Sequence, residues 1–151
     1  MDYVAEIENT ITTVTSLLRH DVPKGKIRVI DRGCPHTPKS LSPGTMGVYT
    51  FLYEDRFLKI GKAGPSSNAR FLSQHYNPGS AQSTLAASIL MDEDMEGKGI
   101  TESNIGNWIK QNCRRIDIII DADLGIFTLE LVEAVLHYKY EPKYEGFKSQ
   151  R

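Results

Sequence analysis

The stretch GVYTFLYEDRFLKIG, residues 47–61, carries the clearest structural signal in the chain. Residues 48–53 are rich in β-branched and aromatic side chains, which favour strands. Residues 54–56 then give a short polar turn, and residues 57–60 return to an apolar composition. This order predicts a β-hairpin of two antiparallel strands.

A third strand is expected near the C-terminal end of the chain. Residues 114–121 contain four isoleucines within five positions, at 116, 118, 119 and 120, which is typical of a buried strand. We therefore expect an α/β fold with a small central, mostly antiparallel, three-stranded sheet of residues 47–53, 57–61 and 114–121, flanked by helices. Residues 24–30 are a further candidate for an edge strand.

The first twenty residues predict an added N-terminal helix over residues 2–20. Its apolar residues recur at steps of three and four, which places them on one face: Val4, Ile7, Ile11, Val14 and Leu18. We favour packing of this face on its own domain. A seam between two copies is the alternative, so a homodimer is left open.

Further helices are expected in the second half of the chain. Residues 66–76 and 103–113 predict two of them, the latter capped by Ser103. A last helix over residues 128–140 has Thr128 as its expected N-cap, with Phe127 and Val132 forming a hydrophobic staple. Residues 84–91 fit a strand or a helix, and the acidic residues 92–99 are expected to form a solvated loop.

The amino-acid composition excludes several classes of protein for this chain. The chain has 151 residues, 40% of them hydrophobic and 25% charged, which fits one folded domain and excludes a disordered chain. A net charge of −1 disfavours a protein that coats nucleic acid indiscriminately, but allows a local basic patch. Cys34 and Cys113 lie outside zinc-binding spacings and are expected to be free thiols. No apolar run reaches the length of a membrane span and no signal peptide is evident, so we expect a cytoplasmic protein.

A basic stripe follows the predicted hairpin. No acidic residue lies between its first and last cations, which are Arg56, Lys59, Lys62 and Arg70. Gly61 ends the second strand, where the missing side chain would let a ligand backbone approach. An ordinary exposed charged face is the alternative interpretation of the stripe.

The last predicted helix carries a candidate metal ligand. Glu133 and His137 are four residues apart and share a face, beside a mainly apolar one. The Glu133 carboxylate could ligate a hard divalent cation, with help from a substrate phosphate. A solvated Glu–His pair is the alternative.

Together these pieces resemble the GIY-YIG nuclease family. They occur in the order GVY at residues 47–49, KIG at residues 59–61, then Lys62, Arg70 and Glu133. The Glu133 helix also runs into a Pro142-x-Tyr144 segment, as the family's glutamate helix does. The resemblance covers roughly residues 46–145, with an insertion-like stretch near residues 77–113. We therefore expect a nuclease-like domain over residues 46–151. Residues 1–45 would precede it as an N-terminal helix and irregular extension.

Three positions depart from the family pattern. Lys59 replaces the second tyrosine, so the second motif is KIG rather than YIG. Gln74 stands where the family often has His or Tyr, with His75 directly after it. Glu145 replaces the asparagine that follows the Pro-x-Tyr segment.

The resemblance implies a metal-dependent endonuclease that hydrolyses a phosphodiester bond of nucleic acid, DNA rather than RNA. Glu133 would hold one Mg²⁺ or Mn²⁺, and Tyr49 would act as general base or relay for the attacking water. Arg70 would clamp the scissile phosphate, and His75 would donate to the phosphate or assist the water.

The remaining candidate residues have supporting roles. Lys62 and Lys59 would make the Tyr49 phenolate more accessible, because an unperturbed tyrosine titrates near 10. Gly61, with these lysines and Arg70, would contact the substrate. The alternative is a nucleic-acid-binding or interaction module that keeps the fold without the chemistry.

Overall fold

The computed structural model describes residues 1–19, 21–81 and 83–145. Within these ranges the chain forms five α-helices, three short 3₁₀ helices and four strands. In chain order they are α1 (Tyr3–Leu18), β1 (Ile27–Gly33), β2 (Thr45–Tyr53), β3 (Arg56–Ala63), α2 (Asn68–Leu72), η1 (Gln74–Tyr76), α3 (Leu85–Leu90), η2 (Glu93–Met95), α4 (Ile105–Asn112), β4 (Arg114–Asp121), η3 (Ala122–Leu124) and α5 (Ile126–Tyr140). None of the described helices has both the length and the apolar composition needed to cross a membrane.

The four strands form one antiparallel sheet in the order β1-β4-β2-β3. The predicted α/β class and the β2–β3 hairpin are confirmed, but the expected count of three strands is wrong. β1 is the additional strand, and it pairs with β4 so that Val29 lies opposite Ile118. Its sequence, IRVIDRG, mixes charged and apolar residues because an edge strand is only half-buried.

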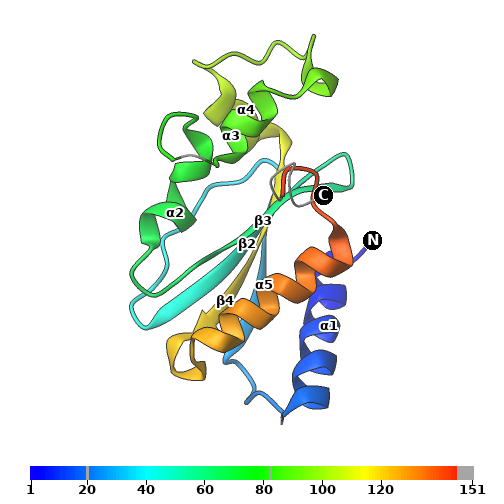
Figure 1. Ribbon diagram of the computed structural model, residues 1–151, viewed down its shortest axis with the longest axis vertical. Coiled ribbons are helices and arrows are strands. Elements are labelled where there is room, and N and C mark those ends of the chain that lie inside the picture. Colours follow the sequence, from blue (N-terminus) through cyan, green and yellow to red (C-terminus); the bar gives the residue numbers. More distant parts are fainter. Residues whose placement is uncertain (20, 82, 146–151) are drawn as a thin grey trace.

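Helices cover both faces of this sheet (Figure 1). α1 and α5 lie against one face, where their apolar side chains pack with Val48 and Ile118. α2, α3 and α4 lie against the other face and pack with Tyr49 and Phe51. Because alternate residues of a strand point to opposite faces, Val48 and Tyr49 belong to different core clusters. The insertion-like stretch at residues 77–113 supplies α3 and α4 and so closes the second face.

The N-terminal region is part of the same core. Tyr3, Ile7 and Ile11 are buried among side chains of β2, β4 and α5. Lys139 of α5 also forms an ion pair with Glu6, with 3.0 Å between Nζ and Oε1. Packing of α1 on its own domain is therefore confirmed for Ile7 and Ile11, whereas Leu18, which was expected on the same face, is 64% exposed. The helix ends at Leu18, and His20 lies outside the described residues, as do residues 146–151 at the end of the expected 46–151 domain.

Helix starts differ from the sequence-based expectation. α5 begins at Ile126, so Thr128 is inside the helix, where its hydroxyl donates to the Leu124 carbonyl instead of capping. Phe127 is 78% exposed, which rules out the staple with the buried Val132. Gly125, whose φ of 87° suits glycine, is the residue that precedes the helix.

The connecting segments also differ in detail. α4 begins at Ile105 after Asn104, so Ser103 is not its cap. Residues 84–91 form a helix, and the Thr84 hydroxyl accepts from the Ala87 amide as its N-cap. The expected solvated loop of residues 92–99 is held in part against the C-terminal segment, because Asp92 accepts hydrogen bonds from Lys143 and Tyr144. The predicted helix over residues 66–76 divides into α2 and η1.

Candidate active site

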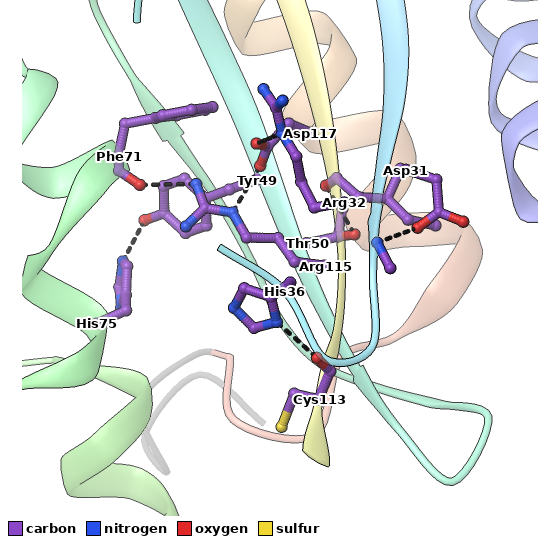
Figure 2. A network of polar contacts seen from close by, with 12 residues as sticks. Asp31, Arg32, His36, Tyr49, Thr50, Phe71, His75, Cys113, Arg115 and Asp117 are labelled. Carbon is purple, nitrogen blue, oxygen red and sulfur yellow. Dashed lines mark hydrogen bonds and ion pairs between the residues drawn. The ribbon is translucent and has the colours of Figure 1, made fainter. Parts of the chain in front are cut away.

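Tyr49 is at the centre of the candidate site. It lies in β2, its side chain is fully buried, and its hydroxyl oxygen meets two side chains from the segment that follows the hairpin. Arg70 Nε lies 3.1 Å from Tyr49 Oη, and His75 Nε2 lies 2.6 Å from the same atom. Figure 2 shows the His75 ring directed at the Tyr49 hydroxyl. The structure therefore brings together three of the residues predicted from the sequence.

Gly61 makes room for this arrangement. It lies directly opposite Tyr49 in the β2–β3 pair. A Cβ at position 61 would come within 2.3 Å of Tyr49 Oη, closer than side-chain atoms ever approach. Glycine at this position therefore leaves room for the tyrosine hydroxyl, and the substrate contact expected of Gly61 stays a prediction.

The hydrogen bonds of His75 fix its tautomer. The Leu85 amide donates to His75 Nδ1 at 3.2 Å, so Nδ1 carries no proton. Burial, with the charges of Lys59 and Arg70, lowers the pKa of His75 to about 3, so the ring is neutral near pH 7. Its single proton is then on Nε2, which donates to Tyr49 Oη.

Tyr49 Oη consequently accepts two hydrogen bonds, one from His75 and one from Arg70. Its own proton is left to donate to a third group. Burial raises the pKa of Tyr49 to about 12, while the Arg70 guanidinium acts in the opposite direction. Tyr49 is thus a neutral phenol near pH 7, held by two donors that would also stabilise the phenolate.

Lys62 and Glu133 form the second part of the candidate site. Lys62 Nζ donates to Glu133 Oε2 in a short ion pair between β3 and α5. The Glu133 side chain is 16% exposed. Lys62 lies opposite Val48, so it faces α5 across the sheet from Tyr49. The two parts of the candidate site therefore lie on opposite faces of the sheet, next to its edge strand β3.

The charge of Glu133, in the second part of the candidate site, acts on Tyr49 and Arg70 in the first part. Burial and then the charges of Glu145 and Glu133 raise the pKa of Tyr49, against the effect of Arg70. Tyr49 and Glu133 are both among the groups that raise the pKa of Arg70. Arg70 is therefore the cation that acts on Tyr49 directly, whereas Lys62 and Lys59 pair with carboxylates.

Lys59 and Glu145 form a further ion pair at the edge of β3. Lys59 is 2% exposed, and its Nζ lies 3.2 Å from Glu145 Oε1 and 3.4 Å from Ser83 Oγ. The C-terminal segment reaches this point along the outer edge of β3, where the Lys143 and Tyr144 amides donate to backbone carbonyls. The charge of the buried Lys59 is thus matched by the Glu145 carboxylate.

A buried polar network behind Tyr49 was not predicted from the sequence. Arg115 and Asp117 of β4 face the same side of the sheet as Tyr49, and their side chains are joined at 2.7 Å between Nε and Oδ1. Arg32 of β1 bonds to the other Asp117 oxygen at 2.8 Å. Figure 2 shows Arg115 between Asp117 and Phe71. The available signal was the alternation of Arg115 and Asp117 with isoleucines, which places two charges on one face of a buried strand.

Metal binding would have to depend on Glu133. Within the described residues, no three or more histidine, cysteine or acidic side chains form a group able to hold a metal ion. A single carboxylate fits Mg²⁺, which often keeps several waters and binds through one or two carboxylates and a substrate phosphate. The Lys62 ammonium occupies this carboxylate in the structure, so a metal ion would have to displace it.

Comparisons with known proteins add no assignment. No protein-family model, no curated protein and no solved structure matches the chain. Cavities of about 390 and 250 Å³ lie beside α1, and no candidate residue lines them.

Proposed function

We propose that this chain is a metal-dependent endonuclease that hydrolyses a phosphodiester bond of nucleic acid, with DNA as the preferred substrate and Mg²⁺ or Mn²⁺ as the cofactor. The observation that carries the proposal is the Tyr49 hydroxyl held by Arg70 and His75, within reach of the charge of Glu133, which pairs with Lys62 on the other face of the sheet. Phosphodiester hydrolysis needs an activated water and positive charge around the transition state. Both can be supplied at this place.

Tyr49 is the proposed proton acceptor or relay. Its oxygen is held by two donors, so negative charge that develops there during proton transfer is stabilised. At neutral pH the phenol is protonated, so it must lose its proton to reach the active form. Extra positive charge brought near the site would promote that loss.

Arg70 is the proposed contact to the scissile phosphate. Its Nε is used by Tyr49, while the residue as a whole is exposed on α2. The terminal nitrogens of a guanidinium donate in a fixed fork that suits phosphate oxygens. Arg70 would thereby place the phosphate next to the tyrosine hydroxyl.

Glu133 is the proposed metal ligand. A bound divalent cation neutralises charge on the phosphate and lowers the pKa of a coordinated water. Lys62 competes for the same carboxylate and, once released from it, would provide a second positive charge at the site. Lys59 is buried against Glu145 and would contribute to the local potential rather than to direct contact.

The test is cleavage of supercoiled plasmid in Mg²⁺ or Mn²⁺ by the unaltered chain, by Glu133→Gln and by Glu130→Gln. Glu130 is an exposed carboxylate one turn earlier on α5, so it is the matched control. We expect nicking or linearisation that EDTA and Glu133→Gln abolish and that Glu130→Gln leaves unchanged. Equal cleavage by both variants would contradict the assignment of Glu133.

The alternative is a nucleic-acid-binding module without catalysis. The Lys62–Glu133 pair favours it, because a carboxylate satisfied by a lysine needs no metal. Binding of duplex DNA, single-stranded DNA or RNA without cleavage of any of them would support this alternative over the nuclease.

A further inference from the structure

The two residues that bond to Tyr49 come from a short and weakly self-supporting segment. Arg70 lies in α2, which has five residues, and His75 lies in η1, which has three. Helices of this length have little stability of their own, because forming the first turn is unfavourable. Neither Ser67 before α2 nor Ser73 before η1 makes a side-chain capping bond. Something outside the segment must hold it in place.

Arg115 contacts this segment at both ends. Arg115 Nη2 donates to the Phe71 carbonyl at 2.7 Å, and Arg115 Nη1 donates to Tyr76 Oη at 2.8 Å. Phe71 directly follows Arg70 in the chain, and Tyr76 directly follows His75. One guanidinium on β4 therefore links to the immediate neighbours of both residues that hold the Tyr49 hydroxyl.

We propose that Arg115 is a positioning residue, which fixes the α2–η1 segment on the sheet so that Arg70 and His75 both reach Tyr49. Its effect on catalysis rests on the proposed nuclease function. The positioning of Arg70 and His75 by Arg115 does not rest on that function and can be measured separately.

The side chains around Arg115 hold its guanidinium in a fixed position. The side chain is 1% exposed, and its centre lies 4.9 Å from the Phe71 ring and 5.2 Å from the Phe51 ring. Asp117, which is fully buried, accepts from Arg115 Nε and from Arg32. A buried charge is tolerated only when it is paired and hydrogen-bonded in this way.

His36 completes the far end of the network. The Tyr76 hydroxyl accepts from Arg115, so its own proton is available for His36 Nε2, which lies 2.8 Å away. His36 Nδ1 lies 2.7 Å from the Cys113 carbonyl and must donate to it. His36 thus carries its proton on Nδ1 and His75 carries its proton on Nε2. The two histidines have opposite tautomers, which gives each a distinct signature in nuclear magnetic resonance (NMR).

Lysine cannot replace this arginine. An ammonium keeps the charge beside Asp117, but it lacks the planar fork that reaches three acceptors in different directions. Arg115→Lys should therefore release α2–η1 without removing the positive charge. The neighbouring Arg114 pairs with the exposed Asp31 on the other side of the strand and has no contact with the segment, so Arg114→Lys is the matched control.

The first readout is independent of activity. Long-range proton–nitrogen NMR spectra of the imidazoles report the tautomer and the titration of His75. We expect Arg114→Lys to match the unaltered protein. In Arg115→Lys we expect a loss of the single Nε2–H form and a rise in the pKa of His75 towards its ordinary value.

The second readout is steady-state cleavage. Displacement of catalytic groups by about 1 Å can cost about a hundredfold in rate. We therefore expect Arg115→Lys to lower kcat at least about tenfold with KM changed much less, and Arg114→Lys to leave both unchanged. If the unaltered chain does not cleave nucleic acid, the nuclease proposal fails, whereas the NMR comparison still decides the positioning role.

Tyr76→Phe is the second variant, in case Arg115→Lys does not fold. It removes one acceptor of Arg115 and leaves the phenyl ring in the core. We expect the His75 signals to shift in the same direction as in Arg115→Lys, by a smaller amount. Unchanged His75 signals in a folded Arg115→Lys, or in Tyr76→Phe if only that variant folds, would overturn the proposal.

Discussion

The close approach of Gly61 to Tyr49 is the tightest steric relation in the candidate site. Adding one methyl group at position 61 forces either the tyrosine ring or the β2–β3 pair to move, because the Cβ would lie within 2.3 Å of the hydroxyl oxygen. The hydroxyl would then leave Arg70 and His75. Space at this position is thus a condition for the geometry of the site.

Gly61→Ala is therefore expected to destabilise the fold by about 1 to 3 kcal/mol, as overpacking does. It should also reduce cleavage at least about tenfold, because the tyrosine hydroxyl is displaced. Gly64→Ala is the control, since a Cβ there meets no atom within 4 Å. Urea unfolding and plasmid cleavage measure the two effects, and a Gly61→Ala protein that behaves like Gly64→Ala would contradict the prediction.

His75 makes stability depend on pH. Its pKa is lowered to about 3 by burial and by Lys59 and Arg70, whereas the unfolded chain has an ordinary histidine. The unfolded state therefore binds more protons below about pH 6.5, and stability is lost as the pH falls. The pKa of His36 is also lowered, chiefly by burial, so it acts in the same direction.

We expect His75 to cost about 2 kcal/mol of stability between pH 7.5 and pH 5.0, from about 1.4 kcal/mol per unit of pKa difference. Urea unfolding of the unaltered chain and of His75→Gln at both values tests this. His75→Gln should lose less stability on acidification. An identical loss in the two proteins would show that His75 does not titrate differently in the folded and unfolded states.

At the scale of the elements, strands were predicted better than helix ends. β4 was expected at residues 114–121 and is found there, because its four isoleucines strongly favour a buried strand. Residues 24–30 were only a candidate edge strand, because charged residues interrupt the apolar pattern, and pairing with β4 places the strand at Ile27–Gly33. Thr128 was a good cap by residue type, but the tight turn at Gly125 starts α5 earlier.

The N-terminal helix gives a direct test of how the elements depend on one another. Ile7 is fully buried between α1 and the sheet, while Leu17 on the same helix is 79% exposed. Ile7→Ala should lower the free energy of unfolding by about 2 to 5 kcal/mol. Leu17→Ala should change it by no more than about 0.5 kcal/mol. A small effect of Ile7→Ala in urea unfolding would mean that α1 is an appendage rather than part of the core.

At the scale of the whole molecule, the fold gathers residues from five elements around the edge of β3. The sequence identified Tyr49, Arg70, His75 and Glu133 through a resemblance in their order. It did not show that Arg70 bonds to the tyrosine, or that Lys62 occupies the Glu133 carboxylate. Those contacts join positions 21 and 71 residues apart, so only tertiary structure reveals them.

The Arg115 network illustrates the same limit. Its members come from β1, β4, η1 and the loop before β2, and each looks ordinary in the sequence. Arg115 and Asp117 are separated by a single isoleucine within a strand whose apolar residues dominate the pattern. The polar network behind the site therefore became visible only once the strands were paired.

In the proposed function, the Tyr49 oxygen takes part in metal-dependent cleavage of nucleic acid. The most direct test compares the rate of plasmid cleavage in Mn²⁺ for the unaltered chain, Tyr49→Phe and Tyr53→Phe. Tyr53 is on the same strand, with its hydroxyl bonded to the exposed Lys98, so it controls for loss of a tyrosine oxygen. We predict a loss of at least about a hundredfold for Tyr49→Phe, in line with general-base catalysis, and no loss for Tyr53→Phe. Cleavage by Tyr49→Phe at the unaltered rate would contradict the claim.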